Sequence, residues 1–195
     1  MLRLVVGLGN PGREYERTRH NAGFWWVERL AQKFKVELRG ERKFNGLAAR
    51  ITSSHDCWLL LPQTYMNLSG QSVEALAGFY KIAPEEILVV HDELDLLAGA
   101  AKLKLGGGAA GHNGLKDISA RIGQNYWRLR LGIGHPGQRD IVVEYVLRAP
   151  SADDAQRISQ AIDRSMEVWP LMQKGEMEKA MHALHTKAGD GKREA

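Results

Sequence analysis

The sequence begins MLRLVVGLGNPG, residues 1–12, in which an apolar run leads directly into a glycine-rich turn. The apolar run over 2–6 predicts a buried strand. The turn, GLGNPG at 7–12, has the G-x-G-x-x-G spacing that follows the first strand of dinucleotide-binding α/β domains. A strand followed by such a turn is typical of an α/β fold, in which the turn either holds a phosphate or serves another purpose.

The residues after this turn argue against a nucleotide cofactor. The dinucleotide fingerprint needs a helix that starts at the loop, so that free backbone amides receive the pyrophosphate. Residues 13–20 are polar, and a helical pattern begins only near Asn21, a candidate N-cap. Pro11 also removes one backbone donor. The same glycine spacing recurs at 106–111, which weakens the motif further. We therefore predict no cofactor, and a tight turn that presents Asn10 at the end of a strand.

Strand-like and helix-like patterns alternate along the rest of the chain. The predicted strands are 46–51, 57–61, 87–92, 100–105 and 126–134, and the predicted helices are 21–34, 67–80, 112–123 and two after Pro150 that Pro170 separates. This alternation predicts a single-domain, three-layer α/β/α fold with a twisted, mostly parallel mixed central sheet. The alternating lysines of AKLKL predict an edge or antiparallel strand. We expect one domain over 1–187 and a mobile tail over 188–195.

Composition limits the class of protein. A chain of 195 residues is long enough for one domain with its own core, and its net charge of +4 permits a polyanionic partner without requiring one. The single cysteine, Cys57, precedes an apolar run and is predicted to be a core residue. No secretory leader and no apolar stretch of membrane-spanning length is visible, so we expect a cytoplasmic protein with no membrane partner.

Three further groups of polar residues lie just past predicted strands or beside turns. They are TRHNAGF at 18–24, PQTYMNLSG at 62–70, and the pair HDELD at 91–95 and GGGAAGHNG at 106–114. Ligands of open α/β sheets bind outside the carboxyl ends of the strands. We therefore expect these segments to form one site together with Asn10.

Together with GLGNPG, these segments closely resemble the bacterial peptidyl-tRNA hydrolase family. The resemblance runs from Leu4 to about Pro150 and includes RLRLGIGHPG at 128–137, while the helical C-terminal part is compatible but less diagnostic. Each motif alone is weak, whereas five in this order and spacing are specific. The resemblance implies a monomeric hydrolase that cleaves the ester between a peptide and the terminal ribose of tRNA, with peptidyl-tRNA as its partner and neither metal nor cofactor.

The resemblance also implies the catalytic pair. In the family, the histidine that corresponds to His20 activates water, and the carboxylate that corresponds to Asp92 orients it, as in a catalytic triad. We expect the field of the following helix and the nearby Arg17 and Arg19 to disfavour imidazolium and keep His20 neutral. Taken alone, His20 is typical of a surface histidine and Asp92 of a turn cap. His91 is expected on the opposite face of its strand and receives no role.

Three asparagines match the family's substrate-binding amides: Asn10, Asn67 and Asn113. An amide side chain both donates and accepts hydrogen bonds, so it can hold a peptide backbone whatever the peptide sequence. Asn113 is also a candidate to hold the water or the developing oxyanion. Tyr15 and Met66 are secondary candidates for the lining of the cleft.

The tRNA half of the substrate needs cations. Lys102 and Lys104 share one face of their predicted strand, and Arg128 and Arg130 share one face of theirs. By resemblance, Lys104 and Arg130 hold the 5′-phosphate of the tRNA, and Lys102 is a weaker candidate for a backbone contact. The alternative for such residues is a solvated face without a ligand.

Two other classes of function are alternatives to a peptidyl-tRNA hydrolase. A serine or metal hydrolase would need a G-x-S-x-G or H-E-x-x-H motif, and the sequence contains neither. A non-catalytic RNA-binding protein on the same fold would not need His20 and Asp92 together. The chain also departs from the family at Ala110, where a glycine is common, and this alanine is expected to restrict its loop.

Overall fold

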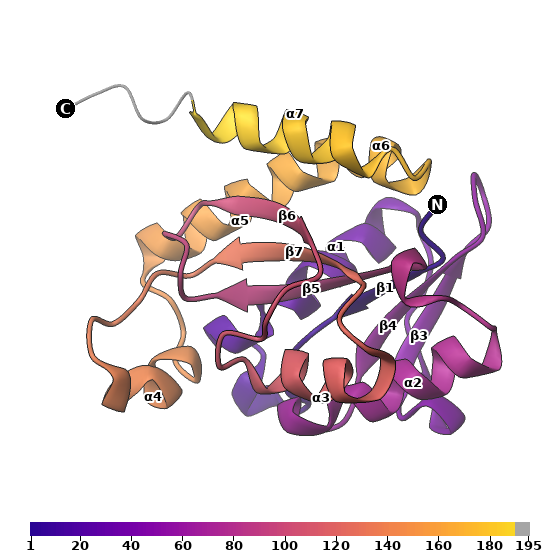
Figure 1. Ribbon diagram of the computed structural model, residues 1–195. Coiled ribbons are helices and arrows are strands. Elements are labelled where there is room, and N and C mark those ends of the chain that lie inside the picture. The colour runs from indigo at the N-terminus through magenta and orange to yellow at the C-terminus, as the bar shows by residue number, and fades with distance from the viewer. Residues whose placement is uncertain (190–195) are drawn as a thin grey trace.

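The computed structural model describes residues 1–189, which fold around one seven-stranded sheet (Figure 1). The strands are β1 (Leu4–Gly7), β2 (Arg39–Glu41), β3 (Gly46–Ile51), β4 (Cys57–Pro62), β5 (Ile87–Glu93), β6 (Ala101–Leu105) and β7 (Trp127–Gly132). The helices are α1 (Ala22–Lys33), α2 (Ser69–Phe79), α3 (Asn113–Ile122), α4 (Val142–Val146), α5 (Ala152–Glu167), α6 (Trp169–Gln173) and α7 (Met177–Gly189). Short 3₁₀ turns include η1 (Arg13–Tyr15), η2 (Arg19–Asn21) and η4 (Met66–Leu68).

The strand order is β2-β3-β4-β1-β5-β7-β6. The four central strands β4, β1, β5 and β7 are parallel, and the strands at both edges pair antiparallel. The prediction of a mixed sheet is confirmed. β6 is an edge strand that pairs antiparallel with β7, as the alternating lysines of AKLKL predicted.

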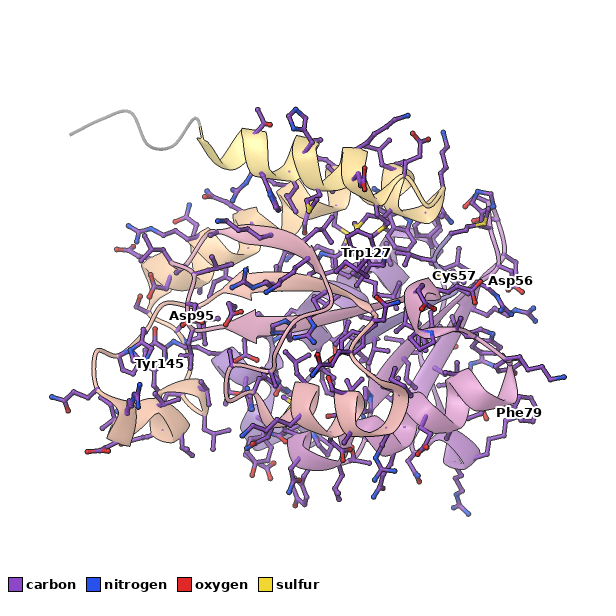
Figure 2. All side chains as sticks on the ribbon, viewed as in Figure 1. Asp56, Cys57, Phe79, Asp95, Trp127 and Tyr145 are labelled. Carbon is purple, nitrogen blue, oxygen red and sulfur yellow. The ribbon has the colours of Figure 1, made fainter. Side chains whose placement is uncertain are left out.

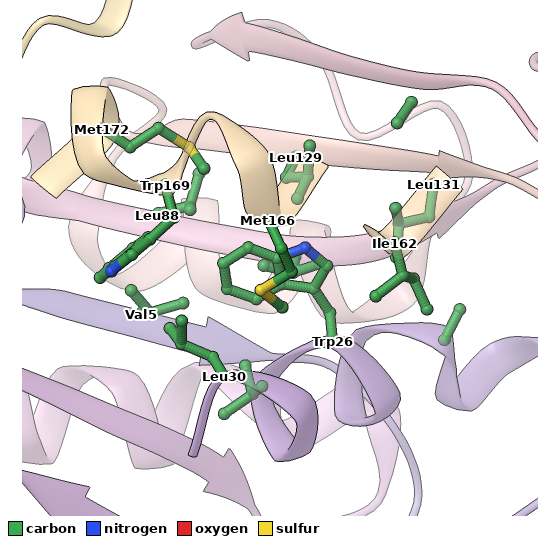
Figure 3. Close-up of a cluster of buried hydrophobic side chains, with 14 of the residues drawn as sticks. Val5, Trp26, Leu30, Leu88, Leu129, Leu131, Ile162, Met166, Trp169 and Met172 are labelled. Atoms are coloured by element: carbon green, nitrogen blue, oxygen red, sulfur yellow. The ribbon is translucent and has the colours of Figure 1, made fainter. Parts of the chain in front are cut away.

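Helices cover both faces of the sheet and bury two apolar clusters. The larger cluster places α1, α5, α6 and α7 on one face, and α2 and α3 pack against the other. In Figure 3, Trp26 of α1 lies among Ile162, Met166 and Trp169 from the C-terminal helices. The Trp26 indole Nε1 donates to Ser165 Oγ at 2.8 Å, which satisfies its one polar group inside the core. The C-terminal helices thus complete the core of the same domain.

The glycines of the opening motif serve packing. A side chain at Gly7 would place its Cβ 2.4 Å from the Gly23 carbonyl oxygen, and one at Gly23 would meet the Val90 carbonyl oxygen at 2.2 Å. Because neither residue has a Cβ, the start of α1 lies directly against β1 and β5. This close approach sets η2, which carries His20, beside the carboxyl end of β5.

Most predicted elements are present, with differences at their ends. Cys57 is fully buried, as predicted. Asn21 is the N-cap residue of α1, as predicted, although its side chain makes no capping bond and instead holds the backbone of Asn10. The sequence patterns missed β2 and α4, which are short and largely exposed. α7 continues to Gly189, and residues 190–195 of the predicted tail lie outside the described residues. Within residues 1–189, no helix has the length and apolar character needed to cross a membrane.

Candidate active site

The carboxyl end of the parallel strands brings His20 and Asp92 together. His20 lies in η2, and its Nδ1 is 3.0 Å from each carboxylate oxygen of Asp92 at the end of β5. Asp92 is 3% exposed, whereas the His20 ring reaches a cavity of about 320 Å³. The ring is therefore oriented from its buried side and open to a ligand on its other side.

A second histidine, His112, also contacts Asp92, with its Nε2 3.0 Å from Asp92 Oδ1. Its Nδ1 accepts hydrogen bonds from the backbone amides of Gly114 and Leu115 at the start of α3, so its proton lies on Nε2 and is donated to Asp92. Sequence reasoning gave His112 no role. The available signal was its position as the N-cap of the helix that begins at Asn113.

The charges in this cluster follow from its burial. Burial alone would raise the pKa of Asp92, but His20 and His112 outweigh it and hold this pKa far below its ordinary range. Burial also lowers the pKa of His20, while the charge and hydrogen bond of Asp92 raise it, and the net pKa is above the ordinary 6.5. The expectation that neighbouring cations would disfavour imidazolium is therefore wrong in direction, because Asp92 is closer to the ring.

His91, the neighbour of Asp92, lies in a different environment. It is 2% exposed, and burial together with the charge of His112 lowers its pKa to about 3. Its Nδ1 donates to the backbone carbonyl of Asp92 at 2.7 Å, so the ring stays neutral and braces the end of β5. The ring also lines a second cavity, separate from the one that His20 lines, as its position in the strand predicted.

The cluster His20, Asp92 and His112 has the residue types of a metal site, with ligand atoms within 4.8 Å of one another. The hydrogen bonds argue against that use. A metal at His112 would need Nε2 without its proton, which would force a proton onto Nδ1 and break both amide bonds at the start of α3. The donor set therefore fits a hydrogen-bonded acid–base cluster better than a metal centre.

Polar amides surround the cavity beside His20. Of the residues predicted to bind substrate, Asn10, Met66, Asn67 and Asn113 line this cavity, whereas Tyr15 does not. Asn10 is fixed on two sides: its Oδ1 accepts from the Met66 amide at 2.8 Å, and its backbone pairs with the side chain of Asn21. The Asn10 Nδ2 is thus the group left for a ligand, held in place by a rigid frame.

One wall of this cavity is apolar and comes from α4. Val142, Val143, Val146 and Leu147 line it, and Val143 is 71% exposed. The buried Arg19 holds this helix: its Nη1 donates to the carbonyls of Tyr145 and Arg148, and its guanidinium lies 3.9 Å from the centre of the Tyr145 ring. Tyr145 and Asp95 lie at the same end of the sheet, opposite Cys57 (Figure 2).

The sequence did carry a signal for this wall. It was the spacing of apolar residues over 142–147, from which no element was predicted.

The predicted cations share one face of β6 and β7. The register pairs Lys102 with Arg130 and Lys104 with Arg128, and a cavity of about 320 Å³ is lined by Lys104, Arg128 and Arg130 but not by Lys102. Arg130 donates to Glu93 Oε1 at 2.8 Å and stays partly exposed. Arg128 is buried and donates to the Gly107 and Gly108 carbonyls, so it supports the glycine-rich loop.

The glycine-rich loop that Arg128 supports contains Ala110, the residue that stands where the family commonly has a glycine. This residue has φ +47°, in the left-handed region that favours glycine. The adjacent Gly111 also has positive φ, at +82°. The alanine therefore has a strained backbone conformation at the rim of the cavity, and its restriction of the loop stays a prediction.

Comparison with known proteins gives one consistent result. The family model described as "Peptidyl-tRNA hydrolase" matches residues 4–192. The chain is similar to the peptidyl-tRNA hydrolase of Methylobacillus flagellatus (59% identity over 187 residues, 95% of this chain and 97% of that protein). It is also similar to that of Neisseria meningitidis (57% identity, 95% and 98%). Its fold is similar to the crystal structure of peptidyl-tRNA hydrolase from Acinetobacter baumannii (TM-score 0.92, 49% identity, 94% of both chains).

Proposed function

The chain belongs to the peptidyl-tRNA hydrolase family, and from this premise we propose how its residues cleave the ester of peptidyl-tRNA. It hydrolyses the bond between peptide and tRNA, which frees tRNA for translation. The observation that carries the mechanism is the contact between His20 Nδ1 and Asp92 at 3.0 Å, in the wall of a cavity lined by asparagine amides.

The first step is the activation of water. Because Asp92 is ionised, it accepts the Nδ1 proton of His20 and leaves Nε2 free to accept a proton. A water at Nε2 gives up that proton as its oxygen attacks the ester carbonyl, and the imidazolium that forms is stabilised by Asp92. His112 donates to the same carboxylate and keeps it in place.

The second step is the collapse of the tetrahedral intermediate. The amide of Asn113 donates to the oxyanion, and Asn10 and Asn67 hold the peptide backbone. As the carbon–oxygen bond to the ribose breaks, the Nε2 proton of His20 passes to the ribose oxygen. The products are a tRNA with a free terminal hydroxyl and a peptide with a free carboxylic acid, which then releases its proton to solvent, so atoms and charge balance.

The tRNA half is proposed to lie over β6 and β7. Lys104 and Arg130 hold the 5′-phosphate, and Lys102, on the same face, contacts the backbone nearby. Since phosphate contacts release counterions, binding weakens as salt rises. The buried Arg128 does not contact tRNA and instead shapes the loop beside it.

The reaction is proposed to need no metal and no cofactor, because a metal at His112 would break the start of α3. We propose that the protein acts as a monomer, since one chain supplies every residue of the site. Cytoplasmic localisation stays a prediction, and it is supported by a substrate that arises in translation.

The test is hydrolysis of purified peptidyl-tRNA with and without EDTA. The wild-type protein should cleave equally in both conditions, and His20→Ala should lose at least about 100-fold in kcat/KM. His182→Ala, which removes an exposed histidine of α7, is the matched control and should cleave like the wild type. A fully active His20→Ala variant would overturn the mechanism, and loss of activity in EDTA would overturn metal independence.

A further inference from the structure

A third cavity of the protein has no part in the mechanism above. Its volume is about 510 Å³, larger than the cavity of about 320 Å³ beside His20. It lies at the carboxyl ends of β1 and β4, between the turn after β1 and the first half of α1. Asn10 lines both cavities, so a single residue forms the boundary between them.

The position of this cavity follows from the topology. β1 leads into α1 on one face of the sheet, and β4 leads into α2 on the other face. Neighbouring parallel strands whose connections leave toward opposite faces open a crevice at their carboxyl ends, where α/β proteins bind ligands. The crevice is therefore a ligand-binding position of the fold that the catalytic step leaves unused.

The strand order places the cations, the catalytic pair and the third cavity one after another across the sheet (Figure 1). The cations lie on β6 and β7, Asp92 ends β5, Asn10 follows β1, and the third cavity lies beside β4 and β3. A substrate whose tRNA occupies β6 and β7 and whose ester meets His20 has its peptide on the side of Asn10. The chain of the peptide then runs toward the third cavity.

The lining of this cavity suits a peptide of any sequence. Its floor is apolar and includes Leu47, Leu61 and Trp25. Its rim carries Arg17 and Glu28, which have opposite charges and are exposed. An apolar floor with a rim of mixed charge binds extended chains without selecting one net charge.

Resting on the proposed function, we propose that this cavity is a second peptide subsite, which binds residues of the nascent peptide upstream of the residue esterified to tRNA. The cavity beside His20 is small and holds the esterified residue and its nearest neighbour. Longer peptides continue past Asn10 into the crevice and gain contacts there. The site thus favours long peptidyl-tRNAs over short ones without contacting the ester.

The test compares two substrates that carry the same esterified residue: N-acetyl-aminoacyl-tRNA and a pentapeptidyl-tRNA. Leu47→Trp fills the floor, and Glu28→Lys changes the exposed rim. Leu47→Trp should lower kcat/KM for the pentapeptidyl substrate by about tenfold and leave the short substrate unchanged. With an uncharged pentapeptide, Glu28→Lys should alter kcat/KM for neither substrate, because the rim carries both charges. Glu178→Lys makes the same charge change on α7, outside the lining, and should alter neither.

Activity on the short substrate reports that each variant is folded. Equal loss on both substrates in Leu47→Trp, or no loss on either, would overturn the subsite. If the wild-type protein cleaves neither substrate, the proposed function fails instead, so the two failures are distinct.

Discussion

The Nδ1 atom of His20 lies 3.0 Å from both carboxylate oxygens of Asp92, although 72 residues separate the two in the chain. This contact joins the segment before α1 to the end of β5, and it depends on the glycines that let α1 approach the sheet. In the proposed mechanism, Asp92 fixes the tautomer of His20 and stabilises the positive charge that the ring acquires during the reaction.

Asp92→Asn should therefore lower kcat/KM by about 100-fold or more, because the amide removes the negative charge and no longer fixes the proton on Nδ1. The measurement is steady-state hydrolysis of peptidyl-tRNA, together with the melting temperature of the variant. A folded Asp92→Asn protein with wild-type kcat would show that Asp92 has only a structural role.

The dependence of activity on pH follows from the same pair. Imidazolium cannot accept a proton, so kcat/KM should rise with pH through the pKa of His20 and then level off. Asp92 raises that pKa above 6.5, and the rise should be centred above this value in the wild type. In Asp92→Asn the raising effects are lost while burial remains, so the midpoint should move to lower pH. An unmoved midpoint would mean that another group controls the profile.

Arg130→Ala should weaken tRNA binding and reduce the slope of log K against log salt by about one. Arg130 remains partly exposed beside Glu93, which leaves its guanidinium accessible to a phosphate. Arg39→Ala provides the control, because this exposed arginine lies on β2, at the far edge of the sheet, and pairs with Glu37. An unchanged slope in Arg130→Ala would remove this residue from the phosphate site.

The fold was predictable where local patterns are strong. The structure confirms the buried strand that the apolar run within 87–92 predicted and the amphipathic helix that the periodicity of 21–34 predicted. β2 spans three exposed residues and α4 five residues, too short for a periodic signal. Asn21 occupies the predicted N-cap position of α1, but its side chain binds the backbone of Asn10 and no amide of the helix, a long-range choice that local patterns do not reveal.

The site was predictable to the extent that its motifs resemble a family. His20, Asp92 and the asparagines come from such motifs, and the structure brings them to one cavity. The roles of His112 and Arg128 depend on side-chain geometry, since each contacts groups about 20 residues away in the chain. The sign of the pKa shift at His20 required the distances to Asp92, which sequence neighbours cannot supply.

Arg19 links the catalytic segment to the apolar wall of the cleft, and its removal gives a further prediction. Its guanidinium donates to the carbonyls of Tyr145 and Arg148 at 3.0 and 3.3 Å. These bonds give carbonyl groups at the end of α4 a hydrogen-bond partner. Arg19→Met should lower the free energy of unfolding by about 2 kcal/mol, because buried charge-assisted hydrogen bonds are lost. Without this anchor α4 moves from the cleft, so KM for peptidyl-tRNA should rise more than kcat falls.

Arg148→Met is the matched control for that variant. It keeps the backbone carbonyl that Arg19 binds and removes only an exposed side chain, so KM should stay at its wild-type value. Arg19→Lys keeps the charge but loses the planar group that stacks on Tyr145, and it should fall between Arg19→Met and the wild type. If Arg19→Met instead lowered kcat with KM unchanged, Arg19 would act through its neighbour His20 rather than through α4.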